Sequence, residues 1–215
     1  NTLIQAGNDG QRSTRADAAR FQGSYRELVS KVNGMLDAIA TPINEASSVL
    51  EHVSRGDLSR ELDGRLVGDY AKIQKSVNET VGVLRNLLAE FDRIVKDSNQ
   101  GKLSSRTRDG EFQGGYQQLC TKVNQMLDGI LAPIHESSEV LQAVAKGDLT
   151  RQVEGDYRGD HEVIKRNLNE TVEVLRRLLK ETNALIQSCR AGELKSRLDA
   201  QHFGGSYREL CGQIN

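Results

Sequence analysis

The stretch Gly56–Gly64, GDLSRELDG, recurs 91 residues later as Gly147–Gly155, GDLTRQVEG. Looser copies of its opening lie between and around these two, at steps of 46, 45, 46 and 45 residues. The glycines that open the copies, called here the connector glycines, are Gly10, Gly56, Gly101, Gly147 and Gly192. Self-similarity at a fixed period is typical of repeat architectures, so the sequence predicts five consecutive modules.

Two further markers keep this period. An asparagine, in contexts such as KVNGML and SVNETV, recurs at Asn33, Asn78, Asn124, Asn169 and Asn215. Eight residues before each asparagine lies an aromatic residue or a histidine: Tyr25, Tyr70, Tyr116, His161 and Tyr207. The distance from this residue to the next connector glycine is always 31, whereas the distance from the glycine to the next such residue is 14 or 15. Because an insertion in a packed helix rotates every later side chain, the constant segments are predicted to be helices and the variable ones connectors.

Local signals agree with these boundaries. Ser24 and Ser206 each precede a glutamate by three residues, as in a capping box, and Asp69 and Asp160 stand at the equivalent position. We therefore expect these four residues to be N-caps. Each predicted helix runs into a connector glycine, which we expect at the C′ position just past the helix end.

Each long segment carries one apolar seam with a double step of four. In the first segment the seam contains Tyr25, Leu28, Val32, Met35, Ile39, Ile43, Ala46, Leu50 and Val53. The same register recurs from Tyr70 to Ser98, from Tyr116 to Val144 and from His161 to Cys189. A doubled four in a pattern of threes and fours is a stutter, which locally unwinds a supercoil. Each long helix is thus predicted to be two half-helices fused end to end.

The connectors carry paired anchors, two and six residues past the glycine. The pairs are Leu58 with Leu62, Leu103 with Thr107, Leu149 with Val153, and Leu194 with Leu198, while the first copy has Arg12 and Ala16. A flexible linker has no need of apolar residues at fixed offsets, so the connectors are predicted to pack on the helices. A chain of 14 residues can run back along a half-helix, and the next helix would then start beside the previous one and run parallel to it.

Composition excludes several functions. Lys and Arg number 29 against 30 Asp and Glu, so no net charge marks a nucleic-acid or anionic-membrane partner. No apolar run reaches the roughly 18 residues of a membrane span. Three cysteines without a C-x-x-C pair fit a reducing compartment, and we expect a cytoplasmic location, with or without a membrane anchor elsewhere in the parent protein. The chain begins with Asn1 and stops in mid-pattern at Asn215, as expected for a fragment of a longer protein.

No catalytic, cofactor-binding or metal site is predicted. The four histidines, His52, His135, His161 and His202, lack paired ligand spacing and are expected at the surface or at helix edges. Cys120 and Cys211 share the register of Val29 and are expected to be packing thiols. No phosphate loop or nucleophile–base pair is present, so we expect no enzyme activity and no small-molecule ligand.

Two short parallel helices with one stripe each cannot enclose a core, but two such pairs can close a four-helix bundle, so the expected partner is a second copy of the chain. A helix, a connector of the form G-x-apolar-x3-apolar, and a helix containing VNxML or VNETV resemble the HAMP domain, the relay module of bacterial chemoreceptors and sensor kinases. The likeness covers the whole chain as a tandem array. It implies an all-α fold of parallel homodimeric four-helix bundles stacked end to end into a rod.

The resemblance also has departures. The family's acidic pair at the start of the second helix is matched only by Asp69 and Asp160, and its proline near the start of the first helix only by Pro42 and Pro133. All four belong to the second and fourth copies, which also have the shorter interval of 14 residues. The repeat is therefore a pair of modules, and we expect even and odd modules to adopt two different packings.

The predicted modules are residues 1–40, 41–86, 87–131, 132–177 and 178–215, called modules 1 to 5 below. The function implied by the resemblance is the relay of conformational change between a linked input domain and a linked output domain, such as a chemotaxis signalling domain or a kinase. The alternative is a passive dimeric coiled-coil spacer. Small or polar seam residues such as Ala46, Thr80 and Ser98 favour the relay, because a relay needs two packings of similar free energy.

Overall fold

A computed structural model describes residues 2–215, and every regular element in that range is helical. The four long helices are α2 (Gly23–Ser54), α3 (Asp69–Asn99), α4 (Gly114–Ala145) and α5 (Asp160–Arg190). The short ones are α1 (Thr2–Asn8), α6 (Gly205–Ile214) and the 3₁₀ turns η1 (Ala18–Arg20), η2 (Asp109–Glu111) and η3 (Ala200–His202). The predictions of an all-α fold and of one long helix in each constant segment are confirmed.

Each connector glycine lies two residues past the end of its helix. At the end of α2, the N–H of Gly56 donates to the carbonyl of Val53 at 2.9 Å, and the N–H of Asp57 donates to the carbonyl of His52 at 2.9 Å. These two bonds define a Schellman motif, which requires a left-handed residue at C′. The same pair of bonds closes α1, α3, α4 and α5, and all five glycines have φ between 72° and 85°.

The helix starts differ from the prediction. Asp69 and Asp160 are the first residues of α3 and α5, and Ser24 and Ser206 are the second residues of α2 and α6. None of these four helices has a side-chain cap bond, so the expectation of N-caps at these positions is wrong. The physical reason is a glycine with positive φ immediately before each of these four residues and before Gly115. These glycines are Gly23, Gly68, Gly114, Gly159 and Gly205, with φ between 51° and 60°.

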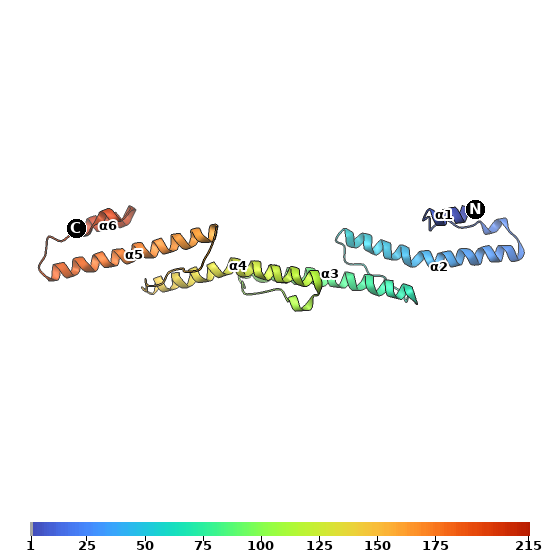
Figure 1. The fold of residues 1–215 in the computed structure, drawn as a ribbon, viewed down its shortest axis with the longest axis horizontal. Helices are drawn as coiled ribbons and strands as arrows, with labels where there is room; N and C mark the ends of the chain where they lie inside the picture. Colours follow the sequence, from blue (N-terminus) through green and yellow to red (C-terminus); the bar gives the residue numbers. More distant parts are fainter. Residues whose placement is uncertain (1) are drawn as a thin grey trace. The chain divides into compact units, whose positions relative to one another are not determined.

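The rear half of α2 lies beside the front half of α3, and the two helices run in the same direction (Figure 1). The connector between them, residues 55–68, runs back along the pair. Ala46 and Val49 of α2, Leu62 of the connector, and Val77 and Val81 of α3 form one buried cluster. The predicted parallel arrangement is therefore found in module 2.

The chain divides into two compact units, residues 1–118 and 119–215, and the division falls within α4. In the second unit, Val140 of α4, Val153 of the connector and Val172 of α5 form the cluster equivalent to that of module 2. A further cluster joins Leu198 and Phe203 of the next connector to Cys211 of α6. Each cluster contains at least one side chain from a connector and at least one from a helix.

Pro42 and Pro133 lie inside α2 and α4, and both helices continue through them. A proline in a helix interior lacks an N–H, so it leaves the carbonyl four residues earlier without its helical partner. The helices α3 and α5 contain no proline. Prolines therefore occur only where an odd module passes into an even one.

None of the helices within residues 2–215 is both long enough and apolar enough to cross a lipid bilayer.

Candidate functional site: the docked connector

The second anchor is buried in the connectors of modules 2 to 5, whereas Ala16 of module 1 is half-buried. Leu62, Val153 and Leu198 pack in the three clusters described above, and Thr107 is buried at the same position. The first anchors differ between the two kinds of module. In the even modules Leu58 and Leu149 are half-buried against their clusters, whereas Leu103 and Leu194 in the odd modules are 41% and 74% exposed.

The expectation that Leu103 and Leu194 are packed is thus wrong. The odd connectors make an extra turn directly after the glycine, closed by N–H bonds from Ser105 to the carbonyl of Lys102 at 3.3 Å and from Ser196 to the carbonyl of Glu193 at 3.2 Å. The first anchor lies inside this turn. In the even connectors the turn is replaced by an aspartate, Asp57 or Asp148, whose carboxylate accepts bonds from the serine or threonine two residues later.

The repeated asparagine clamps the connector to the second helix. In module 4, the N–H of Val153 donates to Oδ1 of Asn169 at 2.8 Å, and Nδ2 of Asn169 donates to the carbonyl of Val153 at 2.9 Å. Asn33, Asn78 and Asn215 hold Ala16, Leu62 and Leu198 in the same way. An extended connector has no neighbouring strand, so the asparagine supplies both partners that a buried backbone unit requires.

Even modules hold the connector with polar side chains from the second helix. Gln74 donates to the carbonyls of Leu62 and Gly64 at 2.8 and 2.7 Å, and Lys165 donates to those of Glu154 and Gly155 at 3.2 and 2.8 Å. A second contact comes from an arginine eleven residues, about three turns, further along the helix. Arg85 Nη2 donates to the carbonyl of Leu58 at 2.6 Å, and Arg176 Nε donates to that of Leu149 at 3.1 Å.

In odd modules, apolar residues and cysteines replace these polar side chains at the same positions of the second helix. The residues equivalent to Gln74 and Lys165 are Val29, Cys120 and Cys211, and both cysteines are fully buried. Cys211 packs against Phe203, the residue that follows η3, and Phe203 is also buried. An arginine of the connector itself binds its own backbone: Nη1 of Arg197 donates to the carbonyls of Leu194 and Ser196 at 3.0 and 2.8 Å. Arg15 and Arg106 make the equivalent bonds in modules 1 and 3.

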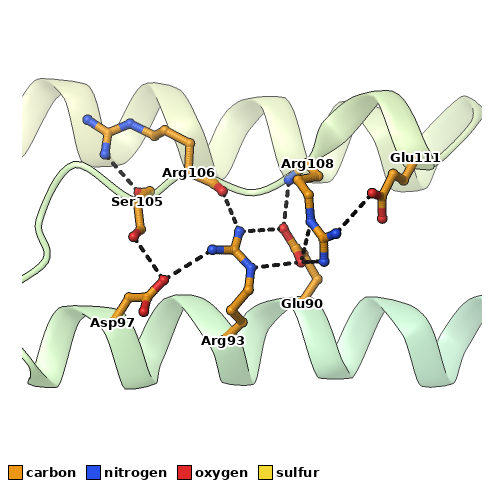
Figure 2. Close-up of polar contacts among 7 residues, drawn as sticks. All are labelled: Glu90, Arg93, Asp97, Ser105, Arg106, Arg108 and Glu111. Carbon is orange, nitrogen blue, oxygen red and sulfur yellow. Dashed lines mark hydrogen bonds and ion pairs between the residues drawn. The ribbon is translucent and has the colours of Figure 1, made fainter.

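Module 3 contains a buried carboxylate with several cationic partners (Figure 2). Glu90 of α3 is 3% exposed. Its Oε1 accepts from Nη2 of Arg93 at 2.7 Å and from the N–H of Arg108 at 2.7 Å, and its Oε2 accepts from Nη2 of Arg108 at 2.9 Å. The hydrogen bonds from Arg93 and Arg108 lower the pKa of Glu90 to about 2 despite its burial. The glutamate is therefore ionised at neutral pH.

The same network ties α3 to the connector at a second point. Nη1 of Arg93 donates to Oδ2 of Asp97 at 3.1 Å, and Nη2 of Arg93 donates to the carbonyl of Arg106 at 2.6 Å. Oγ of Ser105 donates to Oδ2 of Asp97 at 2.8 Å (Figure 2). Three residues of α3 thus hold the connector on the two sides of Thr107: Glu90 binds Arg108, Arg93 binds Arg106, and Asp97 binds Ser105.

The described histidines do not form a common site. Nδ1 of His52 contacts the carbonyl of Ser48 at 2.7 Å, and His202 lies 3.2 Å from Asp199. Within residues 2–215 no group of three or more His, Cys, Asp or Glu side chains could hold a metal ion. Cys189 is exposed, in contrast to the two buried cysteines.

The roles of the asparagine and of Glu90 were not predicted from the sequence. A polar residue at one position in every copy, as at Asn33 and its equivalents, is the signal in the sequence that could have indicated a contact repeated in every module. Glu90 has an equivalent eleven residues before each connector glycine from module 2 onward, and that repeat was the available signal: Glu45, Glu90, Glu136 and Glu181.

Parallel helices joined by a docked connector, repeated along one chain, define a tandem array of helix–connector–helix modules. A family model described as the HAMP domain matches residues 20–86 and 111–177, more than half of the chain. The chain therefore belongs to the HAMP domain family. The two matches begin 91 residues apart, which is the period of the paired repeat.

A similar curated protein is the methyl-accepting chemotaxis protein McpB of Pseudomonas aeruginosa, which is 30% identical over 97 residues. The match covers 45% of this chain and 14% of McpB. The chain thus spans only a small part of the length of this relative.

Proposed function

We propose that this chain is a homodimeric signal-relay array, which transmits conformational change between a linked input domain and a linked output domain through alternating bundle packings. The observation that carries the proposal is the apolar seam. Most of its large apolar residues are exposed on the isolated chain, although seam residues such as Ala46 and Val77 are buried against the connector. The family membership and the likeness to a segment of a chemotaxis protein support a signalling role.

Large apolar side chains of the predicted seam are exposed along all four long helices. Tyr25, Leu28 and Met35 of α2 are 73%, 58% and 57% exposed. The other exposed seam residues are Val32, Ile39, Leu50, Ile73, Leu88, Val95, Tyr116, Leu119, Met126, Ile130, Ile134, Leu141, Ile164, Leu179 and Ile186. Exposed large apolar residues in one register form a stripe on each long helix, which differs from the scattered single apolar residues of a monomer surface and so favours a covering partner.

A second copy of the chain is the partner that fits this stripe. The stripe keeps one register through four helices, and an identical chain in parallel orientation presents the same residues at the same heights. Two parallel pairs then close a four-helix bundle in which the connectors remain on the outside.

The two kinds of connector support alternation along the array. Even modules hold their connector through Gln74 or Lys165, and the odd module 5 holds its connector through the Phe203–Cys211 contact. These contacts act at the start of the second helix, so they bias how that helix is placed against the first. A relay of this kind inverts its signal at each module, because neighbouring modules favour opposite packings.

Deletion of modules from the full-length protein tests this function. Removing residues 42–86, one module, is expected to invert the response of the output domain to stimulus. Removing residues 42–132, a pair, is expected to preserve the sign of that response. A passive coiled-coil spacer predicts no inversion in either deletion, so unchanged sign after removal of residues 42–86 would refute the alternating relay.

A further inference from the structure

A glutamate recurs in the first helix of modules 2 to 5, eleven residues before the connector glycine. The four are Glu45, Glu90, Glu136 and Glu181. The seam and anchor patterns do not require it, because it lies between the seam positions. Its surroundings differ from module to module, and this difference carries the inference.

In module 4 the glutamate binds the connector without any arginine. Oε1 of Glu136 accepts from the N–H of Glu154 at 2.6 Å and from that of Gly155 at 3.2 Å. The hydroxyl of Tyr157 donates to Oε2 of Glu136 at 2.6 Å. These bonds lower the pKa of Glu136, with the Tyr157 hydroxyl as the largest cause. The ring of Tyr157 packs against the cluster of Val140, Val153 and Val172.

The two contacts share one target. Arg108 and Glu154 are each the residue after the buried second anchor, and each donates its backbone N–H to the glutamate of its module. The additional donors differ: guanidinium groups around Glu90, and a phenol hydroxyl at Glu136. Two unlike donor sets thus hold the carboxylate on the same backbone group.

Modules 2 and 5 lack these bonds. Glu45 is exposed, Glu181 is half-buried, and neither accepts a bond from its connector within the described chain. The residue after the second anchor is acidic in both, Asp63 and Asp199, but Glu154 of the closed module 4 is acidic too, so the difference lies in the additional donors. In module 2 the position of Tyr157 is occupied by Leu66, which has no donor.

We propose that this glutamate is a connector latch, that is, a carboxylate that fastens the connector to the first helix. The latch is closed, with its bonds to the connector made, in modules 3 and 4, and it is open in modules 2 and 5. The side-chain donor that the connector supplies determines whether the latch closes. Glu90 and Glu136 are positioning residues: they hold the connector, and the connector holds the second helix. The inference rests on the proposed relay for its signalling meaning, in that the closed modules resist a change of packing and the open ones accept it. The latch itself requires only the contacts within one chain.

Backbone hydrogen exchange on the full chain, expressed as protection factors, tests the latch. The amides of Arg108 and Glu154 are expected to exchange about tenfold more slowly than those of Asp63 and Asp199, because one charge-assisted bond changes the opening equilibrium by about that factor. Glu90→Gln and Glu136→Gln are each expected to remove most of the protection in their own module only. Glu139→Gln, an exposed glutamate of α4, serves as the control.

A gain of latch separates this role from general stability. Leu66→Tyr gives module 2 a phenol hydroxyl at the position equivalent to Tyr157, where it can donate to Glu45. Leu66→Phe supplies the same ring without the hydroxyl. The tyrosine variant is expected to slow exchange at the Asp63 amide several-fold relative to the phenylalanine variant. High salt is expected to speed exchange at Arg108 and to leave Glu154 unchanged, since only the former is held by guanidinium groups.

Two outcomes would overturn the latch: equal protection at the four amides, or identical exchange in the Leu66→Tyr and Leu66→Phe variants. Neither outcome depends on the oligomeric state or on the output domain. Failure of the latch is therefore distinguishable from failure of the relay, which the module deletions test.

Discussion

The side-chain amide of Asn78 binds both backbone groups of Leu62: Oδ1 accepts from the Leu62 N–H at 2.8 Å, and Nδ2 donates to the Leu62 carbonyl at 3.1 Å. The side chain of Leu62 is itself buried between α2 and α3. One helix residue therefore satisfies the backbone of the connector at the point where its side chain enters the core.

Asn78→Ala is expected to destabilise the chain by about 2–4 kcal/mol, because two partly buried backbone groups each lose a partner at about 1–2 kcal/mol. Urea unfolding measures the change. Asn86→Ala on the exposed side of α3 is the control and should be nearly neutral. Equal midpoints for the two variants would show that water replaces the clamp without loss.

Gly68→Ala tests the start of α3. Gly68 has φ 60° and ψ −134°, a region open essentially to glycine alone, and a Cβ there would meet nothing within 4 Å. The loss of about 1–3 kcal/mol therefore comes from the backbone and not from a clash. Gly34→Ala, in the exposed interior of α2, is expected to stabilise by about 0.5–1 kcal/mol. Opposite signs in thermal unfolding would bear out this distinction, and a neutral Gly68→Ala would contradict it.

The anchors are expected to differ in rank. Leu62→Ala should lose about 2–5 kcal/mol because its side chain is buried, and Leu58→Ala less because it is half-buried. Leu194→Ala should be nearly neutral on the isolated chain, since the side chain is 74% exposed. Denaturant unfolding of the three variants gives the order, and a large loss at Leu194 would mean that a partner chain covers it.

Acid should weaken module 3 through Glu90. The folded pKa of about 2 lies below the ordinary value of 4.5, so the ionised form stabilises the fold above the ordinary pKa. That stability is lost as the pH falls from about 4.5 towards about 2. The difference in unfolding free energy between the wild type and Glu90→Gln is therefore expected to be constant above pH 5 and to shrink below it. A difference that does not depend on pH over this range would rule out the ionised form as its source.

Cys189 offers a native probe of the dimer. It is exposed and occupies the last seam position of α5, whereas Cys120 and Cys211 are fully buried within the chain. A short bismaleimide is expected to join two chains through Cys189, and light scattering to give about twice the chain mass of 23.8 kDa. Cys189→Ser should abolish the cross-link and leave the mass unchanged. A compact particle of one chain mass would exclude the homodimer.

The positions and the ends of the long helices could be predicted from the sequence, because both depend on residue spacing. A constant interval of 31 residues located α2 to α5, and the glycines located their ends, because insertions and positive φ leave marks in the order of residues. The starts were misplaced: Ser24 and Asp69 have capping chemistry, but the N-cap of α2 is Gln22, with Gly23 as the first helical residue, and the N-cap of α3 is Gly68. Side-chain chemistry was the weaker guide there, since a serine or aspartate one residue inside a helix has the same letter as one that caps it.

Contacts that cross from helix to connector were harder to predict. Glu90 and Arg108 are 18 residues apart, and nothing in their separation indicates a bond until the connector is known to run back along α3. Leu103 shares its position and residue type with Leu58, yet the extra turn of the odd connector leaves it exposed. The odd connectors are one residue longer than the even ones. The sequence shows this difference in length, but it does not show that the extra residue goes into a turn that exposes the first anchor.

One helix, α3, is shared between the predicted modules 2 and 3. The helix α3 is one continuous rod of 31 residues that supplies the second helix of module 2 and the first helix of module 3. Along such a helix each residue is turned by about 100° from the one before, so the number of residues between Asp69 and Asn99 sets their relative direction around the axis. One residue inserted near its middle would turn everything downstream by about 100°. In the proposed relay, the number of residues between connectors therefore sets the rotation that α3 passes from module 2 to module 3.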